Sequence, residues 1–181
     1  MQKFEALNLD GILLVTPDRH GDARGWFSET WRQDVWRDNG VGVDLVQDNE
    51  SFSREKGTIR GLHFQITPAA QAKLVRVLRG RILDVAVDIR PKSPSYGKHV
   101  AIELSAECGR QLFIPAGFAH GFCTLEANTH IAYKVSAYYS PSHERGIRWN
   151  DPTLAIPWPA RDDVATLSER DKGLPLFMAL G

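Results

Sequence analysis

The chain has 181 residues, of which 43% are hydrophobic and 24% are charged, so it can bury a substantial core and is too short for two typical domains. Its 22 lysines and arginines balance its 22 aspartates and glutamates, which leaves no net field to attract nucleic acid or an anionic membrane surface. An anionic small molecule would therefore have to be held by cations placed locally.

The start of the sequence has no basic segment followed by an apolar run, and no apolar stretch of about 18 residues occurs anywhere. This pattern predicts a soluble cytoplasmic protein with one domain over residues 1–181. The first predicted element is a short helix over residues 28–40. Ser28 is its expected cap, Trp31 and Val35 share one face, and Gly40 ends it.

Residues 45–140 show a period of two. Within 81–90, for example, Leu83, Val85 and Val87 alternate with the intervening side chains, which indicates a strand. Glycines and prolines separate such runs at intervals of roughly four to eight residues, the rhythm of a sandwich or barrel. We therefore expect a β core over about 45–140, preceded by an N-terminal arm and followed by a C-terminal wrap.

Alternation also places the polar side chains of two predicted strands. Along residues 129–139, Tyr133 and Tyr139 fall on one face. In residues 60–65, His63 falls on the face opposite Arg60, which is awkward if both serve one pocket. Either Gly61 supplies a β-bulge or Arg60 lies at the rim, and the sequence leaves both open.

The C-terminal part contains Pro152, Pro157 and Pro159, followed by a predicted short helix over 168–172. Asp171 lies three residues after Ser168, so it fits a capping box as well as a functional position. The two cysteines, Cys108 and Cys123, lack a CxxC-type neighbour and are predicted to be ordinary buried thiols.

Two stretches carry most of the functional signal. Residues 109–121 fit the Gly-x5-Pro-x-Gly-x2-His pattern of the cupin barrel, in which the histidine, here His120, points into the cavity. Residues 60–65 occupy the place where a metal-binding cupin has His-x-His, but the second position is Gln65. The resemblance implies an all-β cupin jelly-roll barrel with a few short peripheral helices. Gln65 points away from metal chemistry and towards His63 as a lone imidazole base.

Over nearly its full length the chain resembles the dTDP-4-dehydrorhamnose 3,5-epimerase family of nucleotide-sugar epimerases. The motifs that carry the resemblance lie at residues 21–29, 46–49, 59–65, 73–76, 84–90, 114–122, 133–134, 138–141, 144–152 and 168–171. The resemblance implies epimerisation at C3 and C5 of dTDP-4-dehydro-6-deoxy-D-glucose, in dTDP-L-rhamnose and surface-polysaccharide biosynthesis. It also implies a homodimer that requires no metal and no cofactor.

The same resemblance implies roles for individual residues. His63 would be the base, oriented by Asp171, and Tyr133 the proton donor on the other side of the sugar. Lys73 would stabilise the negative charge that forms on O4. Substrate-binding roles carry over to Arg24, Phe27, Glu29, Gln47, Asn49, Arg60, His120, Tyr139, Glu144 and Arg170. The arm that contains Arg24 and Glu29 is the expected segment for crossing to the other subunit.

The chain departs from the family pattern at Glu50, where relatives often have histidine, and the loop over 47–60 looks about one residue longer.

The sequence leaves three other functions to consider. A metal-dependent cupin oxygenase would need three to four histidine or carboxylate ligands, and no second histidine lies close to His63 in the sequence. A sibling epimerase that inverts only C3 or only C5 of a modified sugar would use the same acid and base. A non-catalytic sugar-binding barrel would not need His63, Lys73 and Tyr133 together.

Overall fold

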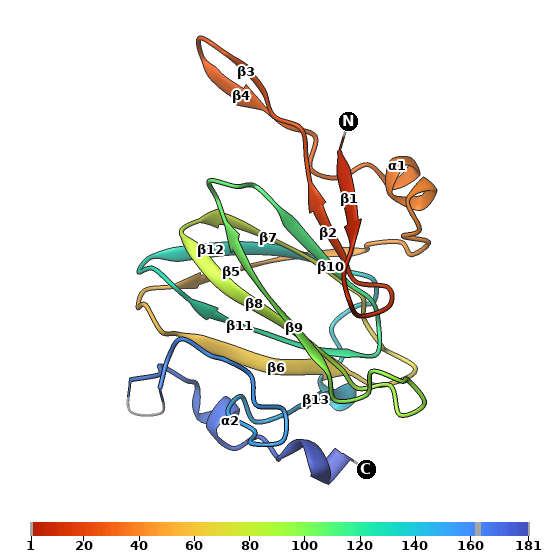
Figure 1. The fold of residues 1–181 in the computed structure, drawn as a ribbon, viewed down its shortest axis with the longest axis vertical. Coiled ribbons are helices and arrows are strands. Elements are labelled where there is room, and N and C mark those ends of the chain that lie inside the picture. Colours follow the sequence, from red (N-terminus) through yellow and green to blue (C-terminus); the bar gives the residue numbers. More distant parts are fainter. Residues whose placement is uncertain (1, 162–163, 181) are drawn as a thin grey trace.

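The computed structural model describes residues 2–161 and 164–180, and its described part is built mainly from antiparallel strands in two facing sheets (Figure 1). The six-stranded sheet has the order β1-β2-β10-β7-β12-β5, formed by Lys3–Ala6, Leu13–Thr16, Gln111–Ile114, Lys73–Arg79, Thr129–Val135 and Gln47–Ser53. The five-stranded sheet has the order β13-β6-β11-β8-β9, formed by Glu144–Gly146, Ile59–Gln65, Phe118–Thr124, Arg81–Asp88 and His99–Ser105. This architecture confirms the predicted all-β jelly-roll barrel.

The main core lies between the two sheets, where period-two alternation sends one set of side chains inward. From β8, Ile82 and Ala86 join Val75 of β7 and Ile131 of β12 in this cluster. The other face of β8 is buried as well, because Val85 contacts a second apolar cluster. The five-stranded sheet is therefore covered on both faces, which explains the nearly continuous burial along β8.

The C-terminal segment provides the outer cover of the five-stranded sheet. Ile147, Leu154 and Phe177 pack in the second cluster, and Figure 1 shows this segment lying along β6 and β13. It contains the short helix α2 (Glu169–Lys172) and the 3-10 helices η1 (Pro141–His143) and η2 (Phe177–Leu180). This segment lies over the outer face of the five-stranded sheet. None of the helices in residues 2–161 and 164–180 is long and apolar enough to cross a membrane.

The N-terminal segment contributes more to the sheets than the sequence suggested, because β1 and β2 extend the six-stranded sheet outside the predicted 45–140 core. Between β2 and the helix, β3 (His20–Asp22) and β4 (Gly25–Phe27) form a hairpin that projects away from the barrel (Figure 1).

The helix predicted over 28–40 is shorter, since α1 spans only Gln33–Asp38 and Arg32, not Ser28, precedes its first turn. The side chains of Gln2 and Gln111 donate hydrogen bonds to the carbonyl groups of residues 29 and 30, which hold this stretch outside the helix. Gly40 follows the helix with a φ of 91°, as expected for its end.

Candidate active site

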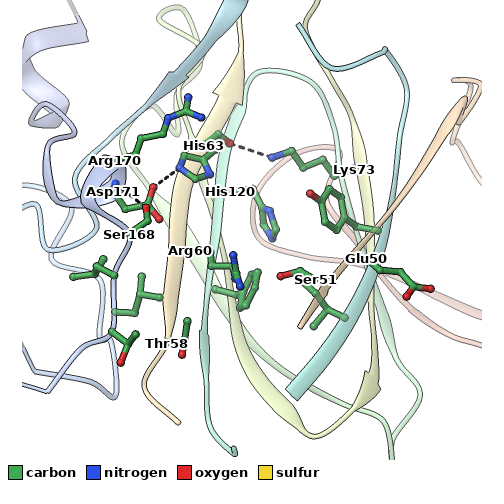
Figure 2. Close-up of a pocket in the computed structure, with 16 residues that line it drawn as sticks. Glu50, Ser51, Thr58, Arg60, His63, Lys73, His120, Ser168, Arg170 and Asp171 are labelled. Carbon is green, nitrogen blue, oxygen red and sulfur yellow. Dashed lines mark hydrogen bonds and ion pairs between the residues drawn. The ribbon is translucent and has the colours of Figure 1, made fainter. Parts of the chain in front are cut away.

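The barrel encloses a cavity of about 550 Å³ whose polar lining includes His63, Lys73, Tyr133 and His120 (Figure 2). A second cavity of about 250 Å³ shares three of these lining side chains, those of His63, Lys73 and Tyr133. Three of the four side chains that the sequence singled out as catalytic thus line both cavities, and the fourth, Asp171, lines the larger one.

His63 is held by a buried carboxylate from the C-terminal wrap. Its Nε2 lies 2.7 Å from Oδ1 of Asp171, which is 3% exposed. Burial alone would raise the pKa of Asp171, but hydrogen bonding and charge interaction with His63 lower it below its usual value. A neutral His63 that donates Nε2–H to this carboxylate presents the lone pair of Nδ1, as a general base requires.

Asp171 reaches His63 because of the local structure of α2. Ser168 caps this helix, and its Oγ accepts a hydrogen bond from the backbone N–H of Asp171 at 3.1 Å. The amide of Gly61 also donates to Oδ2 of Asp171, at 3.4 Å. The backbone of Asp171 thus takes part in the cap at Ser168 while its side chain reaches the cavity, and its role in catalysis stays a prediction.

A bulge in β6 brings Arg60 and His63 to the same cavity. His63 pairs with His120 and Arg60 pairs with Phe122, so between these pairs β6 advances by three positions and β11 by two. The extra residue reverses the side-chain alternation, and both Arg60 and His63 line the cavity. Gly61, with a φ of 119°, lies within the bulge. The bulge hypothesis is confirmed.

Tyr133 comes from the other sheet. It lies on β12, and burial raises its pKa, so its hydroxyl stays protonated over a wider pH range than an exposed phenol. Its side chain lines both cavities. It is therefore available to a bound molecule.

Lys73 is the first residue of β7 and is only 9% exposed. Its Nζ donates to the backbone carbonyl of His63 at 3.2 Å, so Lys73 and Asp171 approach His63 from opposite sides in Figure 2. Burial lowers the pKa of Lys73 to about 8. An ammonium in this position is a short-range source of positive charge beside both cavities.

Glu144 joins Tyr139, which lines the smaller cavity, to Arg170, which lines the larger one. Tyr139 donates its hydroxyl proton to Oε2 of Glu144 at 2.6 Å, and the guanidinium of Arg170 lies 2.7 Å from the same oxygen. The hydrogen bonds from these two residues lower the pKa of Glu144, against the opposing effect of burial. The predicted strand over 129–139 ends at Val135, so Tyr139 reaches this cavity from the loop that follows β12.

Gln47 and Asn49 also line the smaller cavity, and the side chain of Gln47 donates to Oδ1 of Asn49 at 2.8 Å. Their neighbour Glu50 is paired with His130 at 2.9 Å. Gln65, at the position where metal-binding cupins have histidine, binds Ala69 and the loop after β12 instead. Within the described ranges, no group of three or more His, Cys, Asp or Glu side chains is arranged to hold a metal ion.

Three of the predicted binding residues lie away from both cavities in this chain. Arg24 is at the turn of the β3–β4 hairpin, paired with Asp22, and Phe27 is 70% exposed. Glu29 lies with Phe27 beside a different hollow on the surface. Their expected crossing to another subunit stays a prediction.

Two further results concern residues that the sequence misjudged or missed. Cys123 is buried as expected, but Cys108 is exposed, so its predicted burial is wrong. Asp84 was not assigned a role, yet its Oδ1 lies 2.5 Å from Nε2 of His120. Its signal in the sequence was an acidic residue at an inward position of the apolar strand β8, between Ile82 and Ala86.

Comparisons with known proteins agree with this geometry. Residues 6–179 match the family model described as dTDP-4-dehydrorhamnose 3,5-epimerase. A curated protein of that name from Sinorhizobium fredii is 54% identical over 177 residues, which cover 98% of this chain and 90% of the relative.

Solved structures give the same result. The dTDP-4-dehydrorhamnose 3,5-epimerase from Bacillus anthracis, with TDP and PPi bound, is 48% identical with a TM-score of 0.94, over 97% of this chain and 99% of that one. The dTDP-6-deoxy-D-glucose-3,5-epimerase from Legionella pneumophila, in complex with dTDP-4-keto-L-rhamnose, is 41% identical with a TM-score of 0.95, over 100% of this chain and 95% of that one.

Proposed function

The chain belongs to the dTDP-4-dehydrorhamnose 3,5-epimerase family, and we propose that it inverts C3 and C5 of dTDP-4-dehydro-6-deoxy-D-glucose to give dTDP-4-dehydro-L-rhamnose. It is an isomerase that serves dTDP-L-rhamnose biosynthesis. The observation that carries this proposal is the position of His63 and Tyr133, which line one cavity from different sheets.

The chemistry needs a base and an acid on opposite faces of the sugar. The C–H bonds at C3 and C5 are both next to the C4 ketone, so removal of either proton gives an enolate. Reprotonation from the other face inverts the carbon. Imidazole is the side chain most often used as a general base, and His63 takes this role through Nδ1. Asp171 fixes the tautomer and stabilises the imidazolium once it forms.

Tyr133 supplies the proton to the opposite face. Its raised pKa makes it a weak acid towards water, but the enolate carbon is strongly basic and can accept the proton. Lys73 stabilises the negative charge on O4, a contribution of about 3 kcal/mol for a preorganised donor. Proton removal and return leave the oxidation state of the sugar unchanged, so the reaction needs no redox cofactor.

The remaining polar side chains bind the substrate. Arg60 and Arg170 provide guanidinium groups for the pyrophosphate, which planar donors meet through two oxygens at once. Tyr139, which is 52% exposed beside the smaller cavity, provides a ring that can stack on the base. His120, Gln47, Asn49 and Glu144 complete the contacts within one chain.

We further propose that the enzyme acts as a homodimer in the cytoplasm. The support for dimerisation is the projecting β3–β4 hairpin, on which Trp26 is 60% exposed and Phe27 is 70% exposed (Figure 1). In a dimer this arm would bring Arg24, Phe27 and Glu29 to the cavity of the other subunit.

Incubation with dTDP-4-dehydro-6-deoxy-D-glucose in D2O, followed by NMR, tests the function. We expect deuterium at both C3 and C5 of the product. Deuterium at only one of these carbons would instead identify a single-centre epimerase. Release of unlabelled, unaltered sugar would reject catalysis and support a sugar-binding protein.

A further inference from the structure

Asp84 is a buried carboxylate with an unsatisfied oxygen next to the proposed catalytic groups. It is 0% exposed on β8, and its Oδ1 lies 2.5 Å from Nε2 of His120. Its Oδ2 is buried and has no hydrogen-bond partner among residues 2–161 and 164–180. Such an arrangement is unusual, because a buried carboxylate costs much free energy unless its oxygens are paired.

A second carboxylate on the same strand shows the usual arrangement. Asp88 is also 0% exposed, but both of its oxygens accept hydrogen bonds, from Arg90, Ser93 and Ser95. Neither aspartate lines the two cavities that contain His63, but His120, the partner of Asp84, lines the larger one. Asp88 therefore stabilises a loop, whereas the incomplete pairing of Asp84 has no such structural explanation.

The charge of Asp84 acts on Lys73, which lines the same cavity as His120. His120 lines the large cavity and pairs across the strands with His63. The two carboxylates that favour the charged form of Lys73 are those of Asp84 and Glu144. Glu144 is already bonded to Tyr139 and Arg170.

The other titratable groups near Lys73 leave Asp84 as its main source of negative charge. The titratable side chains that line the cavities with Lys73 are Glu50, Arg60, His63, His120, Tyr133, Tyr139, Glu144, Arg170 and Asp171. Of the carboxylates among them, Asp171 is bonded to His63 and Glu50 is bonded to His130. Asp84 and Asp171 are both buried and each is paired with a histidine, but Asp84 is the one of the two that favours the charged form of Lys73.

We propose that Asp84 is a positioning residue whose buried negative charge keeps Lys73 in its ammonium form at the place where O4 of the sugar becomes negative. The inference rests on the proposed function. His120 is bonded to Asp84 and lines the same cavity as Lys73. Burial lowers the pKa of His120 against the opposing effect of Asp84, so His120 adds no positive charge that would compete with Lys73.

The replacement Asp84→Asn tests this inference, because asparagine keeps the shape and an acceptor for His120 but removes the charge. In the wild-type protein, deuterium exchange at C3 and C5 should fall above pH 8, where Lys73 loses its proton. Without the charge of Asp84, Lys73 should lose its proton at a lower pH. A fall of one unit in the pKa of Lys73 would lower the ratio of the exchange rate at pH 8 to that at pH 6 about fivefold relative to wild type, and we expect a decrease of at least this size.

Asp88→Asn is the matched control, since it removes a charge of equal burial from the same strand. It should leave the alkaline limit of the pH profile unmoved even if it lowers stability. If Asp84→Asn lowers the rate by the same factor at every pH, Asp84 has only a structural role and the inference is wrong. If the wild-type protein catalyses no exchange, the proposed function fails first and the inference fails with it.

A stability measurement covers the case in which Asp84→Asn does not fold. The double variant Asp84→Asn with Lys73→Gln removes both buried charges, so neither is left alone in the interior. The inference expects this double variant to fold and to melt at a higher temperature than Asp84→Asn. A double variant that is no more stable than the single one would overturn the inference.

Discussion

His63 and Tyr133 line the same cavity from opposite sheets of the barrel. His63 belongs to β6 of the five-stranded sheet, and Tyr133 belongs to β12 of the six-stranded sheet. A flat ring bound between the sheets would therefore present one face to the imidazole and the other to the phenol. This relationship is what an inversion through an enolate requires, and it separates two steps that can be measured independently.

Replacement of Tyr133 by phenylalanine should uncouple those steps. His63 can still remove a proton and return a deuteron to the same face, so exchange with retention should persist. Inversion should fall by about 10²- to 10⁴-fold, the usual contribution of a positioned acid. NMR of the sugar in D2O distinguishes deuterium at a retained centre from deuterium at an inverted one. Unchanged inversion in this variant would mean that another group is the acid.

Replacement of His63 by alanine should abolish exchange at both C3 and C5, because one base serves both carbons. Affinity for dTDP, measured by calorimetry, should change little, since the binding contacts proposed for the nucleotide do not include this imidazole. His99→Ala is the matched control, because His99 lies on β9 of the same sheet and lines neither cavity. Exchange that survives in His63→Ala would show that the base is assigned wrongly.

Much of the barrel could be predicted from local patterns. Alternation identified β8, the spacing of Ser168 and Asp171 identified the cap, and the family resemblance supplied Asp171 as the partner of His63. The position of Arg60 could not be decided, because the effect of a bulge depends on the register between β6 and β11. A bulge can be suspected from the sequence when a glycine stands at the extra position, as Gly61 does, but its effect on the register cannot.

Other features depended on distant residues and could not be read from the sequence. The start of α1 is set by the side chains of Gln2 and Gln111, which bind the backbone ahead of the helix. Similarly, the pairing of Asp84 with His120 joins neighbouring strands that are far apart in the chain. The positions of Arg24 and Phe27 in an assembly are not determined by any contact within one chain.

Replacement of Gly61 by alanine should destabilise the fold strongly. A Cβ at this position would lie 2.6 Å from Cα of Gly121 and 2.7 Å from the carbonyl oxygen of His120, and neither backbone atom can move freely within the sheet. The positive φ alone would cost on the order of 1–3 kcal/mol. With the clash, we expect a loss above about 4 kcal/mol in the free energy of unfolding, measured in urea.

Gly40→Ala separates the two contributions to this loss. Gly40 also has a positive φ, 91°, but a Cβ there would meet no atom within 4 Å. Its replacement should therefore show only the conformational cost. Equal destabilisation by Gly61→Ala and Gly40→Ala would mean that the close approach of β6 and β11 at Gly61 is unimportant.

The two thiols should differ sharply in reactivity. Burial raises the pKa of Cys123 to about 11. For Cys108 the effect of burial is outweighed by hydrogen bonds from Ser105 and Arg110, which lower its pKa to about 7.

Because the thiolate is the reactive form, iodoacetamide should label one thiol in the folded protein, with a half-maximal rate near pH 7, and two after unfolding. Cys108→Ser should remove the fast reaction, and since Cys108 lines neither cavity, labelled protein should keep its exchange activity. Fast labelling of Cys123 in the folded state would show instead that the cluster around Ile59 and Trp149 opens readily to solvent.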